Sequence, residues 1–195
     1  MANPHQKKFD NPSRLFIWLF SFGNFFRNRS FYNKLLEEID FQGNESVLEF
    51  GSGVGTLAKK IAPKIKNGGS LSCIDVSEKL IQHTKKKLKK FSNIQFYEGN
   101  IIDQAIPAEC YDVIVSTWVL HHVHKGLLPE TIKKFNEVLK KDGNVFIIEF
   151  PDSRIDHTNL SQKDLLELFE RENFSSSIIF TKKQGILYKF QKKYD

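Results

Sequence analysis

The fold is decided by one stretch, Val47-Leu48-Glu49-Phe50-Gly51-Ser52-Gly53-Val54-Gly55-Thr56-Leu57-Ala58. Its apolar start predicts a buried strand, and its three glycines at alternate positions predict a tight turn at which the backbone can approach a ligand closely. From Thr56 onward the pattern predicts a helix, whose N-terminus favours polar or anionic groups. A strand, a glycine turn and a helix in this order are typical of a nucleotide-binding turn in an α/β fold.

The spacing of the glycines separates two kinds of turn. The dinucleotide fingerprint G-x-G-x-x-G would place its third glycine at position 56, where this chain has Thr56. The pattern present is E-x-G-x-G-x-G, with Glu49 two residues ahead of Gly51. Because a glycine turn also joins strands to helices without any ligand, the remaining sequence has to decide.

Composition and charge favour one globular domain and do not point to nucleic acid. The chain has 195 residues, of which 40% are hydrophobic and 18 are Phe, enough to fill a single core. The net charge is +6, but much of the excess lies between Lys79 and Lys90 on one amphipathic helix. A solvated helix face explains this run better than a nucleic-acid-binding stripe does.

The two cysteines indicate a reducing compartment. Cys73 and Cys110 lie far apart, and neither belongs to a CxxC motif or a Cys/His array. This arrangement is typical of reduced thiols in a cytoplasmic protein, and it predicts no metal site.

The apolar run from Leu15 to Phe26 is too short to cross a membrane. It has about a dozen residues, whereas a membrane span needs about 20, and it lacks the pattern of a signal peptide. We therefore expect a cytoplasmic protein in which a helical N-terminal extension, residues 1–29, precedes one domain, residues 30–195.

Alternating strands and helices follow the glycine turn. Each expected strand is a short apolar run bounded by glycine or polar residues, and each expected helix is apolar on one face. This alternation predicts a doubly wound, Rossmann-like sheet that binds ligands at the carboxyl ends of its strands. The expected strands are 46–50, 70–74, 94–97, 111–116 and 144–150, followed by an antiparallel hairpin of 177–180 and 186–190.

Asp75 follows the second expected strand, twenty residues beyond Gly55, and Ser77 is expected to cap the next helix. A carboxylate at this place can accept two hydrogen bonds from ribose hydroxyls. The alternative is an ordinary aspartate at the start of a helix. The spacing from the glycines favours the ribose.

Four stretches together resemble the motifs of the class I S-adenosylmethionine-dependent methyltransferases. The resemblance covers about residues 30–194 and implies a seven-stranded sheet of order 3-2-1-4-5-7-6 whose last strand is antiparallel. The chain supplies a candidate for each strand. The four stretches are the glycine turn, the strand end at Asp75, Glu98-Gly99-Asn100-Ile101, and the strand from Tyr111 to Ser116 running into Thr117-Trp118-Val119-Leu120-His121-His122-Val123.

The resemblance also implies where S-adenosylmethionine binds. It places the methionine part over the glycine turn with Glu49 near the amino group, the ribose on Asp75, and the adenine beside Val76 and the segment that follows Gly99. Many relatives have Asp where this chain has Asn100, whose amide both donates and accepts hydrogen bonds. The cofactor-binding residues implied in this way are Glu49, Gly51, Gly53, Gly55, Asp75, Val76, Asn100, Ile101 and Ser116.

The segment Leu120-His121-His122-Val123 is most similar to the ubiquinone/menaquinone-biosynthesis type of small-molecule methyltransferases. This resemblance implies a small-molecule acceptor or a lipid or quinone-like one. An enzyme of this kind aligns donor and acceptor and, for a hydroxyl, an amine or a carbon acid, helps to remove a proton. Because histidine titrates near neutral pH, His121 and His122, with His124 nearby, are the candidate bases. The alternative is that His122 only packs within its loop.

Two other functions stay open. A cofactor-binding partner subunit without transfer activity is one, because no residue is an unambiguous catalyst. An NAD-dependent oxidoreductase is the weaker one, because Thr56 and the terminal hairpin depart from that fold. Methylation of nucleic-acid bases is disfavoured, because Ser116-Thr117-Trp118-Val119 stands where those enzymes carry an Asn/Asp-Pro-Pro-aromatic motif.

The N-terminal run from Leu15 to Phe26 has three interpretations, which can overlap: a lid, a membrane helix and plain packing in the core. Its density of aromatic residues favours a lid that folds over the acceptor and excludes water. The alternative is an interfacial membrane helix, for which an apolar face flanked by Arg14, Arg27 and Arg29 is typical.

Overall fold

The computed structural model describes residues 12–13, 28–152 and 160–193. They form two compact units, the first ending at Gln104 and the second beginning at Ala105. The run from Leu15 to Phe26 lies outside the described residues, so the extension 1–29 and the domain limits 30–195 stay predictions. Among the residues that the structure describes, no helix is long and apolar enough to cross a membrane.

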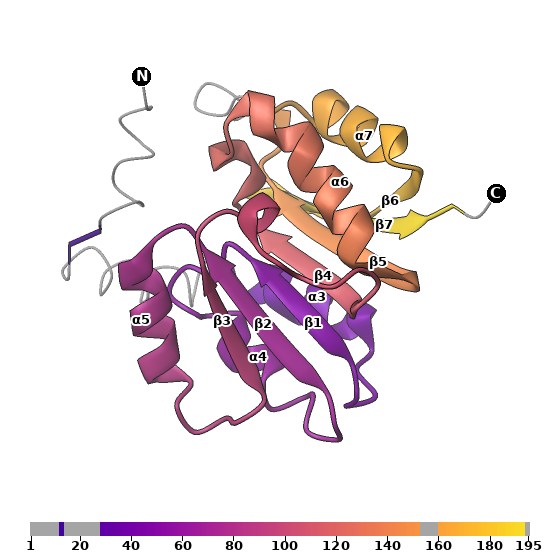
Figure 1. Cartoon of the computed structure of the whole chain (residues 1–195). Helices are drawn as coiled ribbons and strands as arrows, with labels where there is room; N and C mark the ends of the chain where they lie inside the picture. The colour runs from indigo at the N-terminus through magenta and orange to yellow at the C-terminus, as the bar shows by residue number, and fades with distance from the viewer. Residues whose placement is uncertain (1–11, 14–27, 153–159, 194–195) are drawn as a thin grey trace. The chain divides into compact units, whose positions relative to one another are not determined.

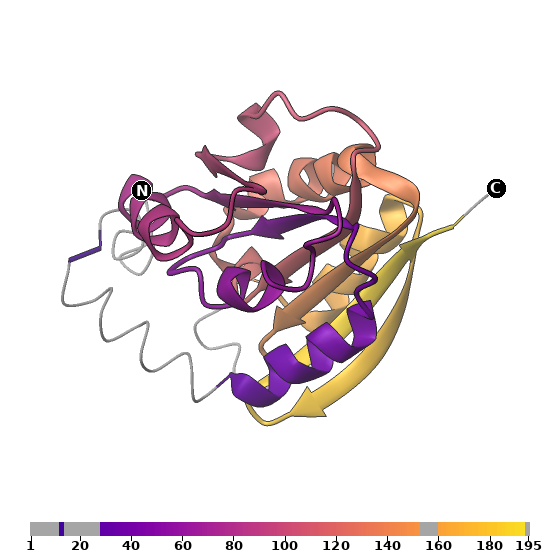
Figure 2. The ribbon, with the colours of Figure 1, turned by 90° about the horizontal axis from the view of Figure 1, so that it is seen from below.

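The first unit is built on three parallel strands in the order β3-β2-β1 (Figure 1). β1 and β2 are buried almost throughout, as their continuous apolar runs predict for parallel strands covered on both faces. Figure 2 shows α3 and α4 on one face of these strands. The elements are α3 (Arg29–Ile39), β1 (Ser46–Phe50), α4 (Ala58–Ile61), β2 (Ser70–Asp75), α5 (Glu78–Lys87), β3 (Ile94–Glu98) and the 3-10 helix η1 (Ile101–Asp103).

The second unit holds four strands in the order β4-β5-β7-β6. β4 and β5 are parallel, and β7 runs antiparallel to both of its neighbours. Helices α6 and α7 pack against each other (Figure 1). The core includes the stacked rings of Phe169 and Phe190, whose centroids are 3.7 Å apart. The elements are β4 (Tyr111–Thr117), η2 (Leu120–His122), η3 (Lys125–Leu127), α6 (Leu128–Val138), β5 (Leu139–Glu149), α7 (Gln162–Arg171), β6 (Phe174–Lys182) and β7 (Gly185–Lys192).

The strand order β3-β2-β1-β4-β5-β7-β6 confirms the predicted doubly wound sheet with an antiparallel last strand. Two strand starts were predicted wrongly: β5 begins at Leu139 and not at Asn144, and β6 begins at Phe174 and not at Ser177. Leu139 pairs with Tyr111, and Lys140 forms an ion pair with Asp112 at 2.8 Å. The sequence from Leu139 to Gly143 looks like a helix end and a turn, but in the structure it belongs to β5. A register shift between Tyr111 and Val113 accommodates it in the pairing with β4.

Candidate functional site

The glycine turn joins β1 to α4 with all three glycines in the left-handed region. Gly51, Gly53 and Gly55 have φ of 73°, 53° and 65°, which side chains disfavour. Their surroundings differ. A Cβ added at Gly53 would meet only the Gly51 carbonyl oxygen, at 4.0 Å, whereas one at Gly55 would lie 2.6 Å from Thr84 Cγ2. Gly53 therefore leaves room for a ligand against the backbone, while Gly55 lets α5 pack closely.

Asp75, at the end of β2, holds this turn through its carboxylate. Oδ2 accepts a hydrogen bond from the Gly53 N–H at 2.8 Å, and Oδ1 accepts one from the Ser77 N–H at 2.9 Å. Ser77 stands at the N-cap position of α5, but its hydroxyl makes no capping bond, so the prediction that it caps the helix was wrong. The Asp75 carboxylate bonds instead to the N–H of Ser77 itself, one residue ahead of the helix. A carboxylate has about four acceptor sites, so two backbone bonds do not exhaust it.

Glu49 is a carboxylic acid buried inside the first unit. It is 3% exposed, and its Oε2 lies 3.9 Å from Cys73 Sγ on β2. Burial, and after it repulsion from Asp75, raises the pKa of Glu49 to about 8, although Lys87, the Ala58 N–H and Cys73 act in the opposite direction. Glu49 therefore carries a proton at neutral pH. A cationic group placed beside it would favour the carboxylate form.

Three buried hydroxyls test whether a polar cofactor fits here. Those of Ser52 and Thr56 in the turn and of Ser77 at the start of α5 have no hydrogen-bond partner among the described residues. Buried polar groups are nearly always paired, so such a group requires an explanation. Together with the open space beside Gly53, these hydroxyls fit a cofactor that carries its own polar groups, as S-adenosylmethionine does.

The end of β2 presents an apolar surface next to Asp75. Val76 is 58% exposed, which suits a residue that packs against a flat ring. The Gly99 N–H donates to the Asp75 carbonyl oxygen at 3.0 Å, which holds the segment after β3 against this strand end. Both are positions that the family resemblance assigned to the adenine side.

The Gln104 side chain also holds the segment that follows β3. Its Nε2 donates to the carbonyl oxygens of Glu98 at 2.9 Å and Asn100 at 3.3 Å. Ile101 is fully buried and anchors η1 in the unit. The sequence analysis missed Gln104, because a side chain that bonds only to backbone carbonyls belongs to no motif.

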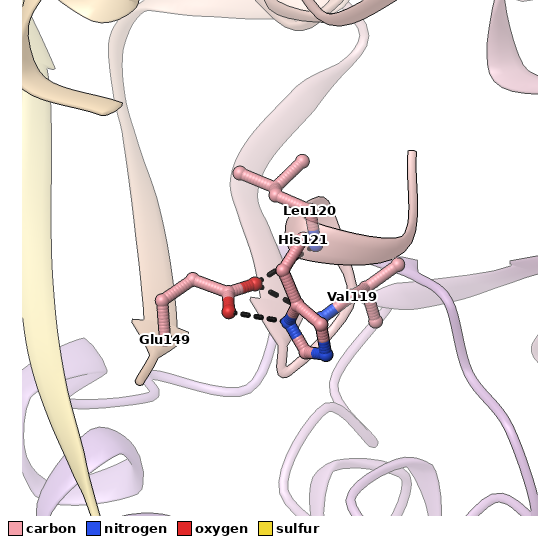
Figure 3. A network of polar contacts seen from close by, with 4 residues as sticks. All are labelled: Val119, Leu120, His121 and Glu149. Carbon is pink, nitrogen blue, oxygen red and sulfur yellow. Dashed lines mark hydrogen bonds and ion pairs between the residues drawn. The ribbon is translucent and has the colours of Figure 1, made fainter. Parts of the chain in front are cut away.

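The second unit contains a carboxylate and an imidazole in close contact (Figure 3). Glu149, the last residue of β5, places Oε2 at 2.6 Å from His121 Nδ1. Its Oε1 accepts the N–H groups of Val119 at 3.0 Å and Leu120 at 2.8 Å. Both side chains are 6% exposed. The carboxylate thus fixes both the imidazole ring and the start of η2, the helix that carries it.

Trp118, which precedes the two residues bonded to Glu149, has an unusual backbone conformation. Trp118 has φ 55°, in the left-handed region that a bulky side chain rarely adopts, and its N–H donates to the Ile148 carbonyl oxygen at 2.7 Å. Strain of this kind persists only where the surrounding structure holds it, and it occurs preferentially at functional sites. Here the N–H groups of Val119 and Leu120, which donate to Glu149, hold the Trp118 backbone in this conformation.

The other predicted bases lie close to this pair. The ring centroid of His122 is 4.0 Å from that of His121. His124 Nδ1 accepts a bond from the Gly126 N–H at 3.2 Å, which gives it a local role at the start of η3. The sequence analysis did not connect Glu149 with His121, because the two residues lie 28 positions apart in the chain.

Ser116 is fully buried on β4, and its hydroxyl has no partner in the described part of the chain. It belongs to the second unit, whereas the other residues assigned to the cofactor belong to the first. Its place at the cofactor therefore stays a prediction. In ranges 12–13, 28–152 and 160–193, no three His, Cys, Asp or Glu residues gather so as to hold a metal ion.

Comparison with known proteins agrees with these observations. Residues 47–143 match the protein family described as a methyltransferase domain. An uncharacterized methyltransferase of Oceanobacillus iheyensis is 28% identical over 145 residues, which cover 74% of this chain and 63% of that protein. The chain therefore spans less than two thirds of the length of this curated relative.

Two solved structures share the fold. A SAM-dependent methyltransferase from Aquifex aeolicus matches with a TM-score of 0.72 at 19% identity, covering 97% of this chain and 99% of that one. Geranyl diphosphate C-methyltransferase from Streptomyces coelicolor, in complex with Mg²⁺, geranyl diphosphate and S-adenosyl-L-homocysteine, matches with a TM-score of 0.70 at 9% identity. That match covers 85% of this chain and 81% of the other.

Proposed function

We propose that this chain, which carries a class I S-adenosylmethionine-dependent methyltransferase domain, moves the methyl group of S-adenosylmethionine to a small-molecule acceptor. The observation that carries the proposal is the glycine turn after β1, with open space beside Gly53 and the Asp75 carboxylate bonded to the Gly53 N–H. The turn and Asp75 lie at the carboxyl ends of parallel strands, where folds of this class bind their ligands.

In this proposal the first unit holds the cofactor. Asp75 accepts hydrogen bonds from the ribose hydroxyls, Glu49 faces the amino group, and the adenine packs on Val76 beside Asn100 and Ile101. The raised pKa of Glu49 supports its role, because a cationic amino group restores the carboxylate that burial disfavours. When bound, S-adenosylmethionine supplies a methyl group on a positively charged sulfur, which keeps the electron pair of the broken carbon–sulfur bond.

The second unit supplies the base. The contact between Glu149 Oε2 and His121 Nδ1 places a proton on Nδ1, so the neutral ring has its lone pair on Nε2. Nε2 takes the proton of the acceptor's hydroxyl, amine or carbon acid, and Glu149 stabilises the imidazolium that results. This contact favours His121 over His122 as the catalytic residue.

We further propose an acceptor with an apolar, lipid-like or quinone-like part, methylated in the cytoplasm. The similarity of Leu120-His121-His122-Val123 to the ubiquinone/menaquinone-biosynthesis type supports this acceptor class. So does the shared fold of geranyl diphosphate C-methyltransferase, whose ligand has an apolar chain. The free thiols Cys73 and Cys110 are compatible with a reducing compartment.

Calorimetry tests the cofactor. S-adenosylmethionine and S-adenosylhomocysteine should bind with micromolar-scale affinity, whereas NAD should not bind. Binding of NAD with no response to either sulfur ligand would favour the oxidoreductase and sink the proposal.

Methyl-labelled S-adenosylmethionine tests the transfer. Incubated with a panel of hydroxylated quinones and fatty acids, the protein should pass label into a product that partitions into organic solvent. His121→Ala should lower the transfer rate by about 10²–10⁴-fold with unchanged affinity for S-adenosylhomocysteine, and the matched control His124→Ala should not. Cofactor binding without transfer to any acceptor would favour the non-catalytic partner subunit.

A further inference from the structure

Helix α5 contacts the glycine turn through two side chains. Thr84 Oγ1 donates to the Gly53 carbonyl oxygen at 2.9 Å, and Lys87 Nζ donates to the Val54 carbonyl oxygen at 2.8 Å. Thr84 is fully buried, and Lys87 is half-buried although it belongs to a run of lysines. Neither bond belongs to a helix or to a strand pairing, so each acts on the shape of the turn itself.

These two bonds and the one from Asp75 fix three successive peptide groups. A peptide group is planar and trans, so fixing its N–H or its C=O sets the direction of the other. Asp75 holds the peptide before Gly53 through the N–H, Thr84 holds the peptide after Gly53 through the carbonyl oxygen, and Lys87 holds the next one. The backbone conformation of the turn is therefore fixed from Ser52 to Gly55.

Glycine loses more backbone freedom on ordering than any other residue, and this turn has three of them. A turn left loose would have to be ordered when the ligand binds, and that ordering weakens affinity. We infer that Thr84 and Lys87 are positioning residues for cofactor binding, which hold the glycine turn in its binding conformation without touching the ligand. The inference rests on the proposed function.

The helical repeat explains why one lysine of the run turns inward. Leu80, Thr84 and Lys87 follow one another at four and three residues, so their side chains lie on the buried face of α5. Burial, followed by repulsion from Lys59, lowers the pKa of Lys87, whereas Glu49 acts in the opposite direction. Lys86 is exposed on the same helix and offers a matched control for the loss of a charge.

The test measures affinity for S-adenosylhomocysteine by calorimetry on the full chain. Thr84→Val keeps the volume and removes the donor, and we expect it to weaken binding by about 5–10-fold, with about 3–10-fold for Lys87→Met. Thr84→Ser keeps the hydroxyl, so it should stay within about twofold of the wild type, as should Lys86→Met. S-adenosylhomocysteine has no net charge, which keeps long-range charge effects small in this comparison.

A second readout separates positioning from general stability. In the ligand-free protein, the Gly53 and Gly55 amides should exchange hydrogen faster in Thr84→Val and Lys87→Met, while the thermal unfolding temperature stays near that of the wild type. Lys87 is only half-buried, so its replacement should disturb folding less than that of Thr84. Lys87→Met therefore remains informative if Thr84→Val does not fold.

Two outcomes would overturn the inference. One is wild-type affinity in a folded Thr84→Val or Lys87→Met protein, and the other is an equal loss in Lys86→Met and Lys87→Met, which would assign the effect to charge. A wild-type protein that does not bind S-adenosylhomocysteine would refute the proposed function itself, and the inference with it.

Discussion

Replacing Glu49 with Gln should change how the stability of this protein depends on pH. The Glu49 carboxyl is buried on β1, and its pKa of about 8 lies far above the 4.5 that it has in the unfolded chain. Gln has the same shape and cannot ionise. Its substitution therefore removes the proton equilibrium and leaves the packing nearly unchanged.

The sign and size follow from the two pKa values. Between 4.5 and about 8 the folded state holds a proton on Glu49 that the unfolded state has lost, so stability falls as pH rises. Each pH unit in this window corresponds to about 1.4 kcal/mol, and the full shift sets a ceiling of about 5 kcal/mol. From about pH 6 to about pH 8.5 the stability of the wild type should fall relative to Glu49→Gln by roughly 2–3 kcal/mol.

Urea unfolding of both proteins at a series of pH values measures this difference. Subtracting the two curves removes the contributions of the other titrating groups, which the proteins share. Glu130→Gln, which alters an exposed carboxylate on α6, is the matched control and should run parallel to the wild type. If the curves of wild type and Glu49→Gln are also parallel over this range, Glu49 titrates like an exposed acid and the reasoning from burial fails.

Three further predictions concern the cofactor and the N-terminal run. Gly53→Val should abolish binding of S-adenosylhomocysteine in calorimetry, while Gly68→Val, which imposes similar backbone strain where a Cβ meets nothing within 4 Å, should leave it intact. Asp75→Asn should weaken the same binding by roughly 1.5–3 kcal/mol, because it removes a charged acceptor; unchanged affinity in a folded variant would take Asp75 out of the site. Deleting residues 1–26 should keep cofactor binding and abolish methyl transfer; co-sedimentation of the intact protein with anionic liposomes, lost on deletion, would instead favour a membrane helix.

The strands could be predicted from the sequence because each is an apolar run that ends at glycine or a polar residue. The start of β5 could not, because Lys140 and Asp142 look like a solvated turn. Only pairing with a distant strand, with Leu139 against Tyr111 and the Lys140–Asp112 ion pair, makes that segment part of the sheet. Local pattern fails where long-range pairing decides.

The glycine turn was found from its spacing, but its three glycines look equivalent in the sequence. The structure separates Gly53, which faces open space, from Gly55, which α5 closes off with Thr84. That distinction depends on how a helix about thirty residues later packs on the turn. The inward direction of Lys87 could have been predicted from the sequence, since the spacing from Leu80 and Thr84 places it on the buried face of the helix.

Asp75 and Glu149, which we assign to ligand binding and to catalysis, also hold the backbone of neighbouring residues through hydrogen bonds. Asp75 accepts the N–H groups of Gly53 and Ser77, and Glu149 accepts those of Val119 and Leu120. Each is the last residue of its strand, β2 or β5, and holds the segment that comes next. Loss of function on replacing either one therefore does not by itself demonstrate a contact with ligand or substrate. For Glu149, repeating the replacement in a His121→Ala background separates the two roles, because the part of the loss that acts through the imidazole disappears there.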